Sequence, residues 1–123
     1  MAQRILVIDD DLFIRELYET VLKKEGYDVD LAVTGEEGLT KLQIGGYALT
    51  LLDMRMPGLD GVGVLDSLQK NPPQQPNGPI ILLTNAGLDE KVNEGIQKGA
   101  AAYLVKADLT PDQLVGNIQK FLG

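Results

Sequence analysis

Polar side chains that could act together chemically stand where successive apolar runs of the chain end. Asp9 and Asp10 end the first run, Asp53 ends the third, Thr84 the fourth and Lys106 the fifth. A strand often ends where polar residues begin, so each position alone is weak evidence for a site. Three carboxylates, a hydroxyl and an ammonium together are more specific. Carboxylates held within a few Å of one another repel, and they then take up protons or bind a cation.

The residue types favour Mg²⁺ and phosphoryl transfer. Mg²⁺ prefers hard oxygen ligands, binds through few carboxylates and keeps several waters. A carboxylate can also act as a nucleophile that forms an acyl phosphate. The transferring phosphoryl group spreads negative charge over its oxygens and needs a metal ion and a cation beside it. Lys106 offers a compact positive charge and Thr84 a hydrogen-bond donor. The set therefore predicts phosphorylation of a carboxylate.

Composition excludes several other kinds of chemistry. The 123 residues include no His and no Cys, so a Ser-His-Asp triad, a zinc or copper site with these ligands and thiolate chemistry are ruled out. The chain can receive a phosphoryl group from a histidine elsewhere but cannot supply one. With 11 Lys and Arg residues and a formal net charge of −7, direct nucleic-acid binding is not expected. The apolar stretch near the N-terminus is too short for a signal peptide or a membrane span, so we expect a cytoplasmic protein without membrane insertion.

The elements that must position these residues alternate between strand and helix. Continuous apolar runs predict strands that are covered on both faces, whereas residues 28–33 alternate as in an edge strand. Residues 71–79 hold four prolines, which predicts a surface loop. The predicted strands are residues 4–8, 28–33, 47–52, 80–83 and 102–105.

Five helices are predicted from apolar residues at helical spacing. A capping box that begins at Thr34 opens the second helix, and Thr110 followed by Pro111 opens the last. The residues expected to face the core are Phe13, Leu17 and Val21, with Leu22 as a further candidate, in the first helix, Leu39 and Leu42 in the second, Val62, Leu65 and Leu68 in the third, Val92 and Ile96 in the fourth, and Leu114, Ile118 and Phe121 or Leu122 in the fifth.

Strict alternation of strand and helix predicts an α/β fold: a doubly wound, parallel sheet of five strands with helices on both faces. In such sheets a ligand site lies outside the carboxyl ends of the strands, where the strand order switches. Four of the five predicted strands deliver a polar or charged residue to that rim. We therefore expect the carboxylates, Thr84 and Lys106 to meet there.

The order of these residues resembles the response-regulator receiver family. The match consists of Asp9-Asp10, the segment Asp53-Met54-Arg55-Met56-Pro57-Gly58-Leu59-Asp60-Gly61, then Thr84, Tyr103 and Lys106. It extends from Ile5 to about Leu122, and the segment that begins at Asp53 is distinctive. The resemblance implies one receiver domain over residues 1–123, with the flavodoxin-like strand order 2-1-3-4-5.

The resemblance also implies a role for each matching residue. Asp53 would accept the phosphoryl group. Asp10 and Asp53 would bind Mg²⁺ directly, together with the backbone carbonyl of Arg55, and Asp9 would act through water. Thr84 and Lys106 would hold the phosphoryl oxygens, and Tyr103 would turn inward as Thr84 moves toward the phosphate.

The sequence departs from the family pattern at one position and carries an unusual cation at another. Members of the family commonly have Pro after the lysine, with a cis peptide bond. Here Ala107 follows Lys106, so this bond is either trans or strained. Arg55, two residues past the acceptor, is a long cation that can pair with the phosphoryl group or with a neighbouring helix. It should change the lifetime of the phosphate, in a direction that the sequence leaves open.

The expected function is a phosphorylation-switched signalling module of a two-component system. It would take a phosphoryl group from a partner histidine kinase or histidine phosphotransfer protein. It would then change the surface around the fourth helix, the fifth strand and the last helix, where a downstream protein docks. Its activity would be self-directed, so it would not be a conventional enzyme. The alternative is a constitutive scaffold that binds partners without phosphorylation, and homodimerisation is left open.

Overall fold

The computed structural model describes residues 2–87 and 89–122; Met1 and Gly123, the ends of the predicted domain, lie outside the described residues. Strand and helix alternate as the sequence predicts. The strands are β1 (Arg4–Ile8), β2 (Asp28–Ala32), β3 (Leu49–Asp53), β4 (Ile80–Thr84) and β5 (Ala102–Val105). The helices are α1 (Leu12–Lys24), α2 (Gly35–Ile44), α3 (Gly61–Lys70), α4 (Glu90–Gln97) and α5 (Pro111–Leu122), and a short 3₁₀ helix, η1 (Lys106–Asp108), follows β5.

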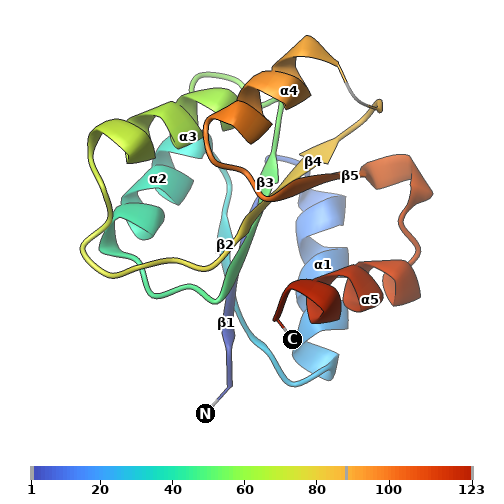
Figure 1. Cartoon of the computed structure of the whole chain (residues 1–123). Helices are drawn as coiled ribbons and strands as arrows, with labels where there is room; N and C mark the ends of the chain where they lie inside the picture. The colour runs from blue at the N-terminus through green and yellow to red at the C-terminus, as the bar shows by residue number, and fades with distance from the viewer. Residues whose placement is uncertain (1, 88, 123) are drawn as a thin grey trace.

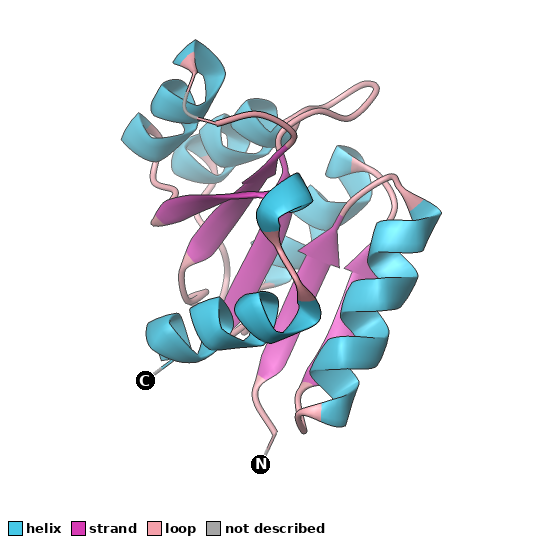
Figure 2. Ribbon diagram, turned by 90° about the vertical axis from the view of Figure 1, so that its right-hand side faces the viewer, coloured by secondary structure: helices cyan, strands magenta, loops and turns pink. Residues whose placement is uncertain are grey.

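The five strands form one parallel sheet in the order β2-β1-β3-β4-β5. Helices α1 and α5 pack on one face of the sheet, and α2, α3 and α4 pack on the other (Figure 1). All the strands point toward the same edge, which Figure 2 shows from the side. The predicted doubly wound fold and its strand order are thus confirmed. The order reverses between β1 and β3, so their carboxyl ends border the crevice where such folds bind ligands.

The core explains why the strands read as continuous apolar runs. Along β1, Ile5 and Val7 pack on the side of α1 and α5, whereas Leu6 and Ile8 pack on the side of α2, α3 and α4. All four side chains are fully buried. A strand that is covered on both faces has no solvent side and therefore no polar alternation.

In α1 and α4, one predicted core residue in each helix is exposed. In α1, Phe13 is 71% exposed, whereas Leu17 and Val21 pack against the core and Leu22 is buried, as predicted. Tyr18 is buried beside them, since a tyrosine ring is mostly apolar and buries well. In α4, Ile96 is 37% exposed and Gly95 is buried. A Cβ at Gly95 would lie 2.6 Å from Leu82 Cδ1, so α4 approaches the sheet too closely for a larger residue there.

Two smaller differences concern the ends of elements. The edge strand β2 ends at Ala32, and Val33 lies outside it and is exposed. The N–H of Val33 donates to Glu37 Oε1, and Glu37 N–H donates to Thr34 Oγ1 at 3.0 Å. The Thr34 half of the predicted capping box therefore forms, and Glu37 bonds the N–H of Val33 in place of the N–H of the N-cap residue. In α5, Phe121 is exposed, and Leu122 packs against the core.

The proline-rich loop 71–79 closes the end of the sheet opposite the strand-end rim. Its Gln74 and Gln75 N–H groups donate to carbonyls at the carboxyl end of α2, at 2.8 and 3.1 Å. Asn77 accepts from Tyr47 N–H and donates to Leu42 O. The loop is therefore part of the packed fold, and orphan carbonyls of α2 gain partners from it. No helix in the described ranges is both long and apolar enough to cross a membrane.

Candidate functional site

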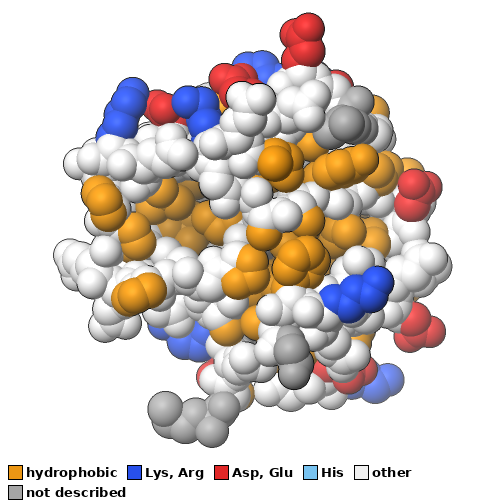
Figure 3. Space-filling model, viewed as in Figure 1, with side chains coloured by type: hydrophobic (Ala, Val, Ile, Leu, Met, Phe, Trp, Pro, Cys, Tyr) orange, Lys and Arg blue, Asp and Glu red, His pale blue; other side chains and the backbone are white. Residues whose placement is uncertain are grey.

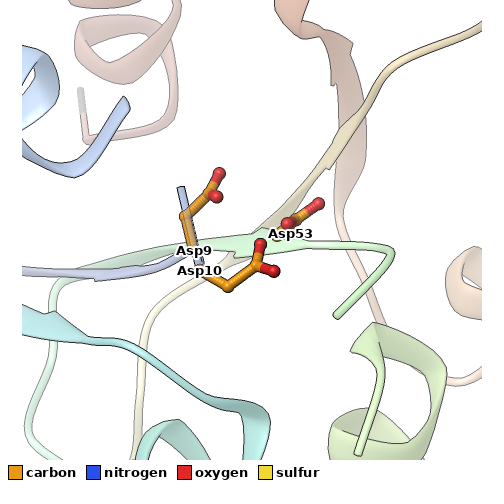
Figure 4. Close-up of side chains that lie close together, drawn as sticks. All are labelled: Asp9, Asp10 and Asp53. Atoms are coloured by element: carbon orange, nitrogen blue, oxygen red, sulfur yellow. The ribbon is translucent and has the colours of Figure 1, made fainter. Parts of the chain in front are cut away.

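Three carboxylates meet at the carboxyl edge of the sheet, as the sequence predicts. Asp9 and Asp10 follow β1, and Asp53 is the last residue of the neighbouring β3. One oxygen from each of the three lies within 4.8 Å of the others, and Figure 4 shows the three side chains close together. The two strands deliver them together because β1 and β3 pair in parallel, so their carboxyl ends lie side by side.

Lys106 lies between two of these carboxylates. Its Nζ is 2.7 Å from Asp9 Oδ2 and 3.2 Å from Asp53 Oδ1. The lysine side chain is only 12% exposed and that of Asp9 is fully buried. Burial on its own lowers the pKa of Lys106, but the two carboxylates outweigh it and raise the pKa above its usual value. The ammonium therefore stays charged, and it links the end of β5 to the ends of β1 and β3.

The peptide bond between Lys106 and Ala107 is trans. Of the two possibilities that Ala107 in place of proline left open, a trans or a strained bond, the structure has the trans bond. The lysine begins the short helix η1 directly after β5. The side chain thus reaches both carboxylates from an ordinary backbone.

Asp9 is held in place more tightly than the other acids. Its Oδ1 accepts a hydrogen bond from the Asp11 N–H at 2.9 Å, and its backbone carbonyl accepts one from Arg15 Nη1 at 2.9 Å. Its Oδ2 is buried and has only the ion pair with Lys106, because no described donor meets it with hydrogen-bond geometry. Arg15 is a residue that sequence reasoning missed. Its place one turn after Asp11, the N-cap residue of α1, was the available signal.

Asp53 has a strongly perturbed carboxyl. Burial, and after it the neighbouring Asp9 carboxylate, raise the pKa of Asp53 to about 6. Lys106 and the Arg55 N–H, which donates to Asp53 Oδ1 at 3.3 Å, act in the opposite direction. Near neutral pH much of this carboxyl is ionised, although burial and Asp9 raise the free energy of the ionised form. A bound cation would lower that free energy.

The arrangement fits a hard cation. A buried carboxylate oxygen without a hydrogen-bond donor, the exposed acid Asp10 and the perturbed Asp53 supply oxygen ligands only. That is the donor set Mg²⁺ prefers. Asp10 and Asp53 border an open cleft of about 510 Å³ that also has Arg55, Asn85 and Lys106 on its walls. The predicted use of the Arg55 carbonyl as a ligand stays a prediction.

Thr84 reaches the rim, but its hydroxyl is engaged elsewhere. The residue ends β4 and is buried. Its Oγ1 donates to the Ala86 carbonyl at 2.7 Å and accepts from the Ala86 N–H at 3.3 Å. A role on a phosphoryl oxygen would require this hydroxyl to leave Ala86.

Tyr103 is partly buried in β5 and packs against the apolar cluster that lies under α2, α3 and α4. It also borders a surface hollow with Leu104, Val105 and Leu109. Figure 3 shows apolar side chains gathered across the middle of this face of the molecule and charged ones mainly around its margin. The switch role of Tyr103 stays a prediction.

Arg55 pairs with Asp89, a residue that the sequence did not identify as its partner. Arg55 Nη2 lies 3.6 Å from Asp89 Oδ2, and Asp89 is the N-cap residue of α4. The guanidinium thus pairs with a neighbouring helix, one of the two partners that the sequence left open.

Comparison with known proteins agrees with this geometry. The model of the response regulator receiver domain family matches residues 5–119. The chain is 40% identical over 120 residues to the probable transcriptional regulator ycf27 of Cyanophora paradoxa. It is 34% identical over 119 residues to the transcriptional regulatory protein ResD of Bacillus subtilis (strain 168). These alignments cover 98% and 97% of this chain but 48% of each relative, so the chain spans about half the length of the curated relatives it matches.

Solved structures agree as well. The crystal structure of a CheY-like response regulator receiver domain protein from Methanospirillum hungatei JF-1 superimposes with a TM-score of 0.87 and 31% identity. The superposition covers 99% of this chain and 94% of that chain.

Proposed function

Because the chain belongs to the response regulator receiver domain family, we propose that it is a phosphorylation-switched module that accepts a phosphoryl group on Asp53. Receiver domains act in two-component signalling, and they are generally signalling modules and not conventional enzymes. They typically bind Mg²⁺ at an acidic pocket. The proposal adds the identity of the acceptor and the roles of the residues around it.

The observation that carries the proposal is the position of Lys106 against Asp53. An ammonium 3.2 Å from the carboxylate can also neutralise a phosphoryl group bonded to that carboxylate. Of the three acids, Asp53 suits the acceptor role best. It borders the open cleft and pairs with Lys106, whereas Asp9 is fully buried and already bonded, and Asp10 borders the cleft without a recorded ion pair to Lys106.

The proposed transfer exchanges one phosphorus bond for another. A carboxylate oxygen of Asp53 attacks the phosphorus of a phosphohistidine on the donor protein, and a phosphorus–oxygen bond forms. The phosphorus–nitrogen bond breaks, and the donor imidazole keeps the electron pair. Later, water attacks the phosphorus, the bond to Asp53 breaks, and the carboxylate and inorganic phosphate are released.

The cation would be held by Asp10 and Asp53, with the Arg55 carbonyl, and by Asp9 through water. When bound, Mg²⁺ supplies positive charge that screens the carboxylates from one another and from the incoming phosphoryl group. Lys106 would hold one phosphoryl oxygen throughout.

Thr84 would connect the acceptor to the outer surface. On phosphorylation its hydroxyl would exchange Ala86 for a phosphoryl oxygen. Tyr103 would turn into the space that Thr84 leaves and so change the face formed by α4, β5 and α5. The proposed partners are a histidine kinase or a histidine phosphotransfer protein as donor, and a protein that docks on this face.

Intact-protein mass spectrometry after incubation with acetyl phosphate tests the proposal. We expect one added phosphoryl group in the wild type with Mg²⁺, and none without Mg²⁺ or in Asp53→Asn. A folded wild type that gains no phosphoryl group would instead support the constitutive scaffold. Addition that persists in Asp53→Asn would move the acceptor to another residue.

A further inference from the structure

Arg55 stands between two anionic positions, the cleft at Asp53 and the start of α4. Its backbone is fixed, because Met54 and Met56 on either side are buried and its own N–H donates to Asp53 Oδ1. Its side chain is 74% exposed, so the guanidinium can move between neighbouring anions. An ion pair of this exposure at 3.6 Å is weak, so a second anion can compete for the guanidinium.

Asp89 uses its two carboxylate oxygens for different tasks. Oδ1 accepts the Val92 N–H at 2.9 Å and so caps α4. Oδ2 faces Arg55. The first contact needs only an acceptor oxygen, which an asparagine also provides. The second contact needs the negative charge.

Phosphorylation would change the balance between the two positions. A phosphoryl group in place of the bare carboxylate brings more negative charge into the cleft. Lys106 already pairs with Asp9 and Asp53. Arg55 is the other cation among the described residues that border the cleft. A guanidinium also suits a phosphoryl group, because its planar donors match the spacing of the oxygens.

We propose that Arg55 is shared by competition between the Asp89 carboxylate and the phosphoryl group on Asp53, so that Asp89 acts as a positioning residue that weakens retention of the phosphoryl group. This inference rests on the proposed function. Each anion lowers the affinity of Arg55 for the other, and this coupling is reciprocal. Phosphorylation therefore releases Asp89 from Arg55, and loss of the Asp89 charge frees Arg55 for the acceptor.

Titration with beryllofluoride in the presence of Mg²⁺, a stable substitute for the phosphoryl group, tests the competition. We expect Asp89→Asn to bind beryllofluoride about two- to fivefold more tightly than the wild type, in line with the strength of an exposed ion pair. In an Arg55→Gln background the same substitution should change the affinity by much less. The affinity is followed by NMR of the backbone amides. The side-chain Nε signal of Arg55 should shift on loss of the Asp89 charge, before any ligand is added.

Glu90→Gln is the matched control, because it removes an equal charge from the neighbouring position while Asp89 keeps both contacts. It should change the affinity less than Asp89→Asn at physiological ionic strength, where more distant exposed charges are screened. An equal effect of Glu90→Gln, or an equal effect of Asp89→Asn with and without Arg55, would overturn the competition. So would an unchanged affinity in Asp89→Asn when the wild type binds. If the wild type does not bind beryllofluoride, or if Asp53→Asn binds it with the same affinity, the proposed function itself would be wrong.

Discussion

Replacing Asp53 by Asn should stabilise the cation-free protein at neutral pH. The native carboxyl is buried beside Asp9, and these two causes raise the pKa of Asp53 from 3.8 to about 6. A shift of one pKa unit corresponds to about 1.4 kcal/mol, so the ionised form costs the fold up to about 3 kcal/mol. An asparagine keeps the shape of the side chain without the charge. We therefore expect a gain of about 2 to 3 kcal/mol in the free energy of unfolding.

The gain should depend on pH with a definite sign. The folded pKa lies above the unfolded one, so the folded protein binds this proton more tightly. The stability of the wild type relative to Asp53→Asn should then fall as pH rises from 3.8 to about 6, and level off above that. Below 3.8 both states are protonated and the advantage of Asp53→Asn should largely disappear.

Urea unfolding in EDTA, over a series of pH values between 4 and 8, measures this difference. Asp28→Asn is the control, since Asp28 is exposed at the opposite end of the sheet, at the start of β2. It should show no comparable gain. An Asp53→Asn protein that is no more stable than the wild type at pH 7.5 would refute the electrostatic reasoning. A gain that grows as the pH falls toward 4 would refute it as well.

Three further outcomes are expected. Mg²⁺ should raise the urea midpoint of the wild type in proportion to the logarithm of its concentration, because it binds only the folded site; an equal rise in Asp53→Asn would contradict this. Thr50→Val should stabilise the protein by about 1 kcal/mol, because the buried Thr50 hydroxyl has no hydrogen-bond partner among the described residues. The exposed Thr40→Val is its control, and a loss of stability in Thr50→Val would count against the reasoning. The Tyr47 hydroxyl donates to Asp30 at 2.8 Å and is the first cause of the lowered pKa of Asp30. Tyr47→Phe should therefore cost about 1 kcal/mol at pH 7, and progressively less as the pH falls below 3.8, because the stability that the lowered pKa of Asp30 contributes is then lost; both are measured by urea unfolding.

The strands and their end residues were predictable because apolar runs and helix-ending glycines mark where each element begins and ends. Continuous apolar runs occur only where both faces of a strand are covered. Gly45, with φ at 87°, ends α2 where a residue with a side chain would be strained. Once parallel alternation is established, the carboxyl ends must share one edge. The meeting of Asp9, Asp53 and Lys106 follows from that geometry, and the family resemblance adds the roles.

Other features depend on contacts that local patterns do not encode. In α1, helical spacing does not show that Tyr18 is buried and Phe13 exposed, because this depends on packing against the sheet and α5. The close approach at Gly95 depends on the position of Leu82 in another element. The pair between Arg55 and Asp89 joins two loops. The hydroxyl of Thr84 could have pointed at the cleft or at Ala86, and nothing in the sequence decides between them.

Two buried polar atoms lack a hydrogen-bond partner among the described residues, Asp9 Oδ2 and Thr50 Oγ1. Their positions in the fold give them different meanings. Asp9 Oδ2 lies at the strand-end rim, 2.7 Å from Lys106 Nζ, so the ammonium compensates its charge. Thr50 lies within β3, paired with Leu6 and Ile80, and has no such neighbour. Thr50→Val should therefore raise stability without changing phosphorylation by acetyl phosphate. Impaired phosphorylation in a stable Thr50→Val protein would instead show that this buried hydroxyl is coupled to the site.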